Sequence, residues 1–301
     1  MICRYMPSLL ALYCACVTFF PVTCLAAEER QTTGFRDYGA GATAGDWNVQ
    51  MSVSHLPAAD LHGVPGDAGI SDYRLKLARN IGVDDRLTLT LGGGYGLKHI
   101  DAPSTAVLPQ ELHALFLEAG ARYRISDSAF ASVKLYPGFY SDFKEFGTGN
   151  LRLPILALGG YSFENGFSVV GGCIYRFGYH TSQFIPALGF SYQPDPFWRF
   201  DLIAPRPGIT YFATRQLQLF VAGDFASDEY EIRDPKFGAQ AMKYSDYKVM
   251  GGFNYLPTPT IKISTSMGYA FDRKFAFFEG NRPDMRIDDV PFFRVSLDLG
   301  W

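Results

Sequence analysis

After its first residues the sequence lacks cysteine pairs, dense charge and any long apolar run. Of its five cysteines, only Cys173 lies beyond residue 27, and charged residues make up only 19% of the chain. A single cysteine cannot form an intrachain disulfide, so the sequence excludes a disulfide-stapled secreted fold. No later stretch is apolar enough for a membrane-spanning helix, and none is polar enough to be disordered.

The first 27 residues have the pattern of a secretory signal peptide. Arg4 supplies a positive charge, a short apolar segment follows, and the sequence CLAAEE predicts cleavage after Ala27. The alternative is a lipoprotein anchored through Cys24, but the sequence PVTC lacks the small residue that normally precedes a lipidated cysteine. We interpret residues 28–45 as a periplasmic N-terminal segment or a small plug.

From residue 46 onward, the chain repeats a two-residue alternation of apolar and polar side chains. The clearest examples are RLTLTLGGGYGLK at 86–98, LHALFLEAGARYRI at 112–125 and TIKISTSMGYAFD at 260–272. Successive side chains of a strand point to opposite faces, so each of these segments predicts a strand with one apolar and one polar face. The mature chain contains no convincing amphipathic helix.

Strand length and aromatic placement favour a membrane protein over a soluble sandwich, which shows the same alternation. The segments run to ten or more residues, which matches the roughly nine to eleven that a tilted strand needs to cross a bilayer. Aromatic residues gather toward the strand ends, as interface girdles require: Tyr73, Tyr123, Tyr161, Phe163, Tyr255 and Phe271. The sequence therefore predicts an all-β protein, a transmembrane antiparallel up-and-down β-barrel over residues 46–301 in the bacterial outer membrane. A secreted soluble β-protein is the alternative.

Turn-forming residues predict the number of strands. Short turns at 82–86, 126–128, 164–166, 193–196, 214–216 and 257–259 alternate with more variable connections at 56–68, 99–110, 141–150, 180–183, 204–208, 232–244 and 275–289. Outer-membrane barrels have short periplasmic turns and longer external loops, so this order predicts 14 strands with both termini in the periplasm. The segment FWRFDLIAPRPGITYF is ambiguous. Read as two strands it has arms of about nine residues, and read as one it carries two prolines in its middle, so 12 strands is the alternative.

The chain ends on an apolar strand face that carries an aromatic residue at its last position. This face contains Phe293, Val295, Leu297, Leu299 and Trp301. The ending resembles the C-terminal signal that the barrel-assembly machinery reads, which implies that machinery as a partner during insertion.

The second half of the chain resembles a known family. The sequences IPALGFSYQPDPFWRFDLIAPRPGITYFATRQLQLFVAGDF and YKVMGGFNYLPTPTIKISTSMGYAFDRKF are similar to an uncharacterised family of predicted Gram-negative outer-membrane β-barrels, known only as a domain of unknown function. The resemblance covers roughly residues 45–301, and the pattern around Trp198, Asp201 and Pro205 is its most specific part. It implies the fold and the location, and it implies no activity.

Two polar groups are weak candidates for chemistry. His180 and Ser182 form a His-x-Ser pair like that of outer-membrane lipid hydrolases, but no third catalytic residue can be nominated. His55 and His62 flank Asp60 in a spacing that matches no standard metal site. We therefore predict no catalytic residues, no metal, no cofactor and no enzymatic activity, with a lipid hydrolase as the less favoured alternative.

The polar faces of the strands predict a basic lumen. The bases predicted to point inward are Arg74, Lys76, Arg86, Lys98, Arg122, Arg124, Lys134, Arg152, Arg176, Arg199, Lys248, Lys262 and Arg294. The inward acids are fewer: Glu118, Asp201, Asp224, Asp272 and Asp298. Other acids are assigned to external loops, namely Asp228, Glu229, Glu231, Asp234, Asp284, Asp288 and Asp289.

This charge distribution has two interpretations. The bases line a porin-like passage for small solutes with a bias toward anions, or they form a salt-bridged ladder that fills a non-conducting structural barrel. The expected partners are outer-membrane lipid and lipopolysaccharide, and no nucleic acid.

Overall fold

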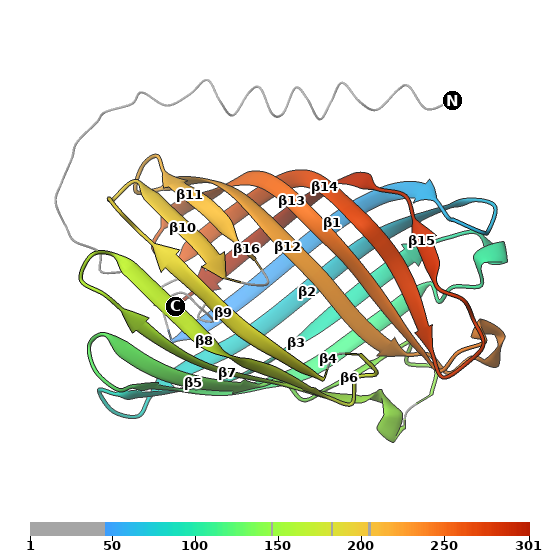
Figure 1. Cartoon of the computed structure of the whole chain (residues 1–301), viewed down its shortest axis with the longest axis horizontal. Helices are drawn as coiled ribbons and strands as arrows, with labels where there is room; N and C mark the ends of the chain where they lie inside the picture. The colour runs from blue at the N-terminus through green and yellow to red at the C-terminus, as the bar shows by residue number, and fades with distance from the viewer. Residues whose placement is uncertain (1–45, 146, 182, 204–205) are drawn as a thin grey trace. The chain divides into compact units, whose positions relative to one another are not determined.

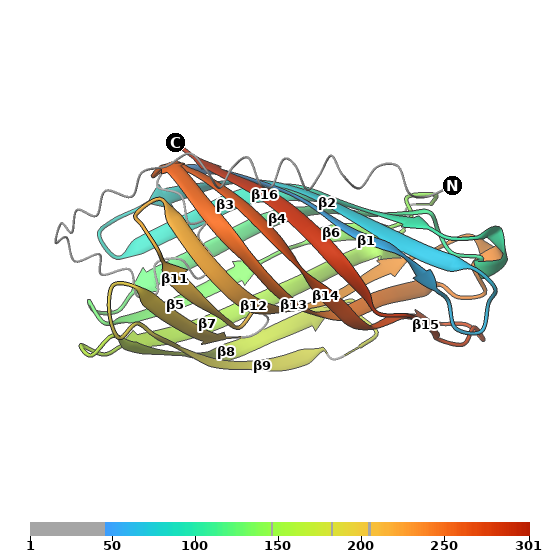
Figure 2. The same cartoon turned by 90° about the horizontal axis from the view of Figure 1, so that it is seen from above.

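The computed structural model describes residues 46–145, 147–181, 183–203 and 206–301. These residues form one antiparallel sheet that is closed into a barrel, with strands that run obliquely around it (Figures 1 and 2). The predicted signal peptide and the segment 28–45 lie outside the described residues. No helix within these four ranges is long and apolar enough to cross a membrane.

The strands are long and follow one another around the barrel. Their bounds are β1 Trp47–Asp60, β2 Asp67–Gly82, β3 Leu87–Asp101, β4 Glu111–Arg124, β5 Ala129–Leu135, β6 Gly138–Ser141, β7 Leu151–Ser162, β8 Phe167–Phe177, β9 Phe184–Tyr192, β10 Trp198–Ile203, β11 Gly208–Phe212, β12 Leu217–Glu231, β13 Ala241–Thr258, β14 Ile261–Phe278, β15 Met285–Ile287 and β16 Val290–Gly300. Short 3-10 helices η1 Ser104–Ala106, η2 Thr148–Asn150 and η3 Pro235–Phe237 lie in the connections.

The described residues make a barrel of 14 strands, as the sequence predicts. Both β5 and β6 pair with β4 and with β7, so they are one barrel strand interrupted at Tyr136 and Pro137. The short strand β15 pairs with β14, and its Ile287 forms an isolated bridge with Leu61. The ring closes between β1 and β16, where Trp47 and Trp301 exchange backbone hydrogen bonds of 3.0 and 3.1 Å.

The ambiguous segment forms two strands, so the alternative of 12 strands is wrong. Strands β10 and β11 are shorter than the arms of about nine residues that we expected, with six and five residues. Strand β10 pairs with β9 only up to Ile203, and β11 pairs with β12 only up to Ala222. The β10–β11 hairpin therefore covers only part of the height of its neighbours (Figure 1).

Several connections are shorter than predicted because the strands continue through them. Strand β1 continues to Asp60 and β3 to Asp101, whereas β13 begins at Ala241 and β14 continues to Phe278. The strands extend in this way because each one continues to form backbone hydrogen bonds with its neighbouring strand beyond the apolar belt. We call the barrel end with the connections 61–66, 102–110, 142–150, 178–183, 232–240 and 279–289 the long-connection end. The opposite end, where the C-terminus lies, is the short-turn end (Figure 1).

The outward face of the barrel is apolar and is bordered by aromatic rings. Aliphatic residues such as Leu117, Leu188 and Val221 are exposed by 59 to 81% between the two ends. Exposed aromatic residues follow the long-connection side (Tyr95, Phe139, Phe225, Tyr247, Tyr269 and Phe271) and the short-turn side (Tyr123, Tyr161, Phe163, Tyr192, Trp198 and Tyr255). A closed antiparallel barrel with an outward apolar band between aromatic girdles is suited to a bilayer. The protein thus has the fold and the outer surface of a membrane-spanning β-barrel.

The interior is packed toward the long-connection end. Its largest apolar cluster contains Leu56, Ile70, Ile100, Leu112, Tyr230, Met242, Tyr244, Phe275 and Phe292. These residues come from β1 to β4, β12 to β14 and β16, and none comes from β7 to β11. A second, smaller cluster joins Phe130, Val170 and Ile203, on β5, β8 and β10. The described interior thus has two parts, and the part nearest the long connections is filled.

Candidate functional site

Ionic side chains cross the barrel interior at mid-height, on the faces opposite the exposed apolar residues. The carboxylate of Glu118 on β4 lies 2.7 Å from the ammonium of Lys76 on β2 and 3.2 Å from that of Lys134 on β5. Glu118 is 2% exposed. One carboxylate between two ammonium groups leaves this cluster with a net positive charge.

A second ionic cluster lies nearer the short β10–β11 hairpin. Asp224 on β12 accepts a 2.8 Å hydrogen bond from Arg294 on β16, and the Arg206 guanidinium at the hairpin tip lies 3.9 Å from the same carboxylate. Lys262 pairs with Asp298 at 2.7 Å on the neighbouring strands β14 and β16. This part of the lumen also carries more guanidinium and ammonium groups than carboxylates.

A third cluster spans the interior between strands that are not neighbours. Lys98 lies 2.6 Å from Asp72 and 3.4 Å from Asp228, and Arg74 lies 3.1 Å from Asp228. Asp72 belongs to β2 and Asp228 to β12, which are separated around the ring by β1, β16, β14 and β13. Side chains therefore bridge the lumen at this level.

At the long-connection end, the wall between β7–β8 and β12 is closed mainly by side chains. Strands β9 to β11 do not reach this level on the β12 side, and β12 meets β6 at a single bridge, Glu231 with Ser141. Arg152 on β7 lies 3.4 Å from Glu231 and 3.5 Å from Glu229, both on β12. The Arg152 guanidinium also donates to the carbonyl oxygen of Gly149.

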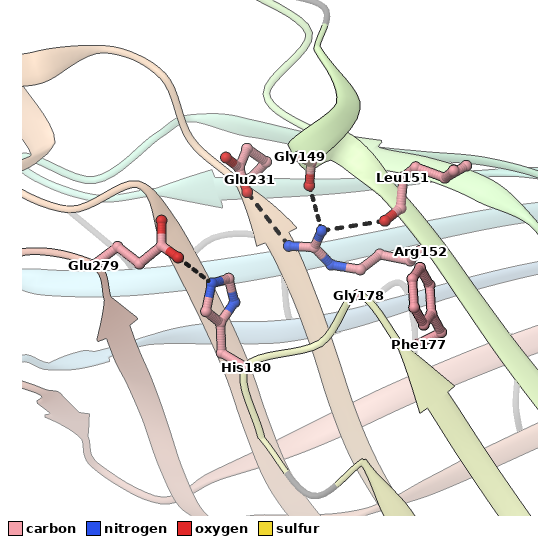
Figure 3. Close-up of a pocket in the computed structure, with 8 residues that line it drawn as sticks. All are labelled: Gly149, Leu151, Arg152, Phe177, Gly178, His180, Glu231 and Glu279. Atoms are coloured by element: carbon pink, nitrogen blue, oxygen red, sulfur yellow. Dashed lines mark hydrogen bonds and ion pairs between the residues drawn. The ribbon is translucent and has the colours of Figure 1, made fainter.

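His180 completes this closure from the connection between β8 and β9. Its Nδ1 lies 2.8 Å from the Glu229 carboxylate. Its Nε2 lies 3.1 Å from the carboxylate of Glu279, just after β14, and Figure 3 shows this second contact. Its ring stacks on that of Phe278 with the centroids 5.3 Å apart. We call the set Arg152, His180, Glu229, Glu231 and Glu279 the polar seam.

A small pocket opens beside the polar seam. Its volume is about 220 Å³, and Figure 3 shows its lining of Gly149, Leu151, Arg152, Phe177, Gly178, His180, Glu231 and Glu279. The pocket separates the end of β7 and the β8–β9 connection from the ends of β12 and β14. Four of the five residues of the polar seam, Arg152, His180, Glu231 and Glu279, line this pocket.

The geometry of His180 favours the imidazolium form. A carboxylate has no proton to donate, so both ring nitrogens must carry one for both contacts to be hydrogen bonds. Partial burial acts to lower the pKa of His180, but the hydrogen bonds to Glu229 and Glu279 outweigh it, and the pKa is raised above its ordinary value. The polar seam therefore contains a histidine that its two glutamate partners hold in the protonated form more strongly than water does.

The bases predicted to line the lumen fall into two groups. Those with carboxylate partners are Arg74, Lys76, Lys98, Lys134, Arg152, Arg199, Lys248, Lys262 and Arg294. Arg176 on β8 instead donates to the backbone oxygen of Ser227, and Arg124 donates to that of Asp85. Arg122 lies over the ring of Phe130. Arg86, just before β3, is exposed at the short-turn end.

The predicted placement of the acids is partly wrong. Asp228, Glu229 and Glu231 lie within β12 rather than in an external loop, and Glu229 is fully buried. The sequence SDEYE is polar enough to resemble a loop, but it pairs residue by residue with β13, where Glu229 faces Lys243. The sequence KYSDYK in β13 could have indicated this pairing, because its lysines complement the acids of SDEYE in β12. Asp272, predicted to point inward, is exposed and has a positive φ of 50°.

The structure describes the two weak candidates for chemistry only in part. Ser182 lies outside the described residues, and His180 is held by two glutamates. His62 pairs with Asp288 at 2.6 Å, whereas His55 contacts Ser71. Within the described part of the chain, no group of three or more His, Cys, Asp or Glu side chains is placed to hold a metal ion.

Solved structures with a similar fold include barrels with different roles. An outer membrane channel from Pseudomonas putida F1 is 14% identical over 86% of this chain and 97% of that one, with a TM-score of 0.48. A FadL homologue from Pseudomonas aeruginosa is 10% identical over 84% and 90%, with a TM-score of 0.44. The translocator domain of autotransporter NalP from Neisseria meningitidis is 12% identical over 87% and 91%, with a TM-score of 0.39.

Comparisons of sequence give no match. No family model matches the chain, and no curated protein matches it either. The resemblance to an uncharacterised barrel family therefore stays a prediction.

Proposed function

We propose that the protein is a porin-like passage for small solutes, with a preference for anions, and that its polar seam is the closed gate of that passage. The observation that carries the proposal is the construction of the wall between β7–β8 and β12. Elsewhere in the described chain, backbone ladders join neighbouring strands, whereas here side-chain contacts, one bridge and a backbone hydrogen bond from Asp142 to Glu231 close the wall. Side chains can separate without the loss of a backbone ladder, so this wall can open while the barrel stays intact.

The preference for anions follows from the interior charges. Glu118 and Asp224 each lie between two bases, and Arg124 and Arg176 contact neutral carbonyl groups. Low-dielectric walls strengthen the field of such charges on a passing ion. Salt should weaken the preference, because the screening length falls from about 10 Å at 0.1 M to about 3 Å at 1 M.

A bilayer conductance measurement under a salt gradient tests this proposal. At low salt we expect a reversal potential that favours chloride over potassium, and the double variant Arg124→Gln, Arg176→Gln should move it toward zero. The matched control Lys274→Gln, Arg286→Gln removes the same charge from the outward face and should leave it unchanged. A cation-selective pore, or equal shifts in both variants, would contradict the anion preference.

The packed interior favours a second candidate, a non-conducting structural barrel. The apolar cluster fills the part nearest the long connections, and the cluster of Lys98, Asp72 and Asp228 bridges the lumen. If this candidate is correct, the purified barrel should show no conductance at any pH, whereas a gated passage should conduct when the polar seam is weakened by Glu229→Gln.

We also propose that the protein is not a lipid hydrolase. A general base needs a free ring nitrogen, and both nitrogens of His180 face carboxylates. Purified protein should leave phospholipid and lipopolysaccharide intact in an assay for released fatty acid. Release that Ser182→Ala abolishes would overturn this prediction.

A further inference from the structure

Three bases form a row on the outward face of the barrel near the long-connection end. They are Lys243 on β13, Lys274 on β14 and Arg286 on β15. The residues on either side of each base along its strand are buried, namely Met242, Tyr244, Arg273, Phe275, Met285 and Ile287. Side chains alternate along a strand, so the three bases point away from the interior.

The row lacks the carboxylates that accompany the interior bases. Lys274 and Arg286 are directly opposite one another in the β14–β15 pair, where two like charges destabilise a sheet. Among the described residues, no carboxylate forms an ion pair with Lys243, Lys274 or Arg286. Glu229 lies directly opposite Lys243 on β12 but is held by His180 and Arg152, and Asp284 is the other acid near Lys243. The cost of this arrangement suggests that an anion from outside the chain offsets the charge.

The position of the row places it at the level of lipid headgroups. Nearer the membrane centre, beyond Ser245 on β13, lies a chain of outward aromatic rings, Phe225, Tyr247 and Phe271, with centroids 4.9 and 5.9 Å apart. Beyond the rings the same face is aliphatic. Aromatic rings mark the membrane interface, so the bases immediately beyond them meet the headgroups rather than the acyl chains.

We propose that Lys243, Lys274 and Arg286 form a binding site for the phosphorylated head of an outer-leaflet glycolipid of the lipopolysaccharide type. Neighbouring strands lie about 4.8 Å apart, and Lys243 is two residues along β13 from Ser245, which pairs with Lys274, so the three bases span roughly 12 Å. A head with several phosphates can contact all three bases, whereas a phospholipid with one phosphate contacts one or two. The aromatic rings below the bases pack against the first carbons of the acyl chains. This inference depends on the long-connection end facing outward, and it does not depend on conductance.

Binding of lipopolysaccharide to the purified barrel in detergent tests the proposal, with native mass spectrometry as the readout. The double variant Lys243→Gln, Lys274→Gln should bind about 25-fold more weakly, since each base near a charged membrane surface contributes roughly a fivefold change in binding. Arg286→Gln alone should bind about fivefold more weakly. The matched control Lys144→Gln, Lys236→Gln removes the same charge from connections at the same end, where both lysines already pair with Asp234, and it should bind like the unchanged protein.

The ligand is identified by three further probes. Dephosphorylated lipopolysaccharide, phosphatidylglycerol vesicles and inorganic phosphate should each bind at least tenfold more weakly than intact lipopolysaccharide. Heat-modifiable mobility on a cold gel confirms that each variant is folded. The proposal is wrong if the double variant binds as tightly as its control, or if phosphatidylglycerol binds as tightly as lipopolysaccharide. A barrel that binds through these residues but conducts nothing would contradict the proposed passage and leave this site intact.

Discussion

His180 illustrates how one side chain can make the stability of the barrel depend on pH. Its folded-state pKa is raised by Glu229 and Glu279 against a lowering effect of burial. The protonated ring therefore stabilises the fold fully below its ordinary pKa of about 6.5, and this contribution is lost as the pH rises through the higher folded-state value. His180→Gln should lower the free energy of unfolding by on the order of 1 kcal/mol at pH 5 and by less at pH 9, measured by urea denaturation in lipid vesicles.

His62 provides the control for this prediction. It also lies at the long-connection end, but it pairs with only one carboxylate, that of Asp288, and the two side chains are 60 and 52% exposed. An exposed pair of this kind contributes little, so His62→Gln should have a smaller effect on the free energy of unfolding than His180→Gln. Equal losses for the two variants at pH 5 would show that the two-glutamate geometry of His180 has no special effect.

At the scale of a strand, two adjacent glycines of β13 differ in the space that their surroundings leave for a side chain. A methyl group on Gly252 would meet the backbone oxygen of Thr265 and lie 2.8 Å from the ring of Phe220, whereas one on Gly251 would come no closer than 3.8 Å to the Phe220 oxygen. Gly252→Ala should therefore cost about 1 to 3 kcal/mol of unfolding free energy. Gly251→Ala should be neutral or stabilising by up to about 1 kcal/mol. Urea denaturation of the two variants side by side checks the difference, and similar losses would contradict it.

The sequence predicts the strands better than it predicts their ends. Alternation identifies segments such as 86–98 because the lipid requires an apolar face there. Beyond the apolar belt that requirement stops, and the strands continue only because a partner strand continues beside them. The prediction of a loop for the sequence SDEYE at the end of β12 is therefore wrong. Its strand conformation depends on pairing with β13, whose residues are distant in sequence.

For the whole molecule, strand number was predictable and the polar seam was not. The number of strands follows from the positions of the turn-forming residues and from the requirement that a closed ring of antiparallel strands contains an even number of them. The polar seam brings together Arg152, His180, Glu229, Glu231 and Glu279 across the space that short strands leave. Only His180 among these had been singled out for chemistry, and neither glutamate partner lies near it in sequence. The assembly machinery as a partner and the orientation of the termini stay predictions.

The short β10–β11 hairpin has a consequence for how such a barrel can evolve. An antiparallel barrel gains or loses strands in pairs, because the strands on either side of the change must remain antiparallel to one another. Strands β9 and β12 are antiparallel to one another, and beyond the hairpin each already has an edge without a ladder partner. Loss of residues 198–212 would bring two such edges together, and duplication of the same hairpin would widen the ring with few ladder bonds to replace. Relatives of this chain with different strand numbers should therefore differ first at this position.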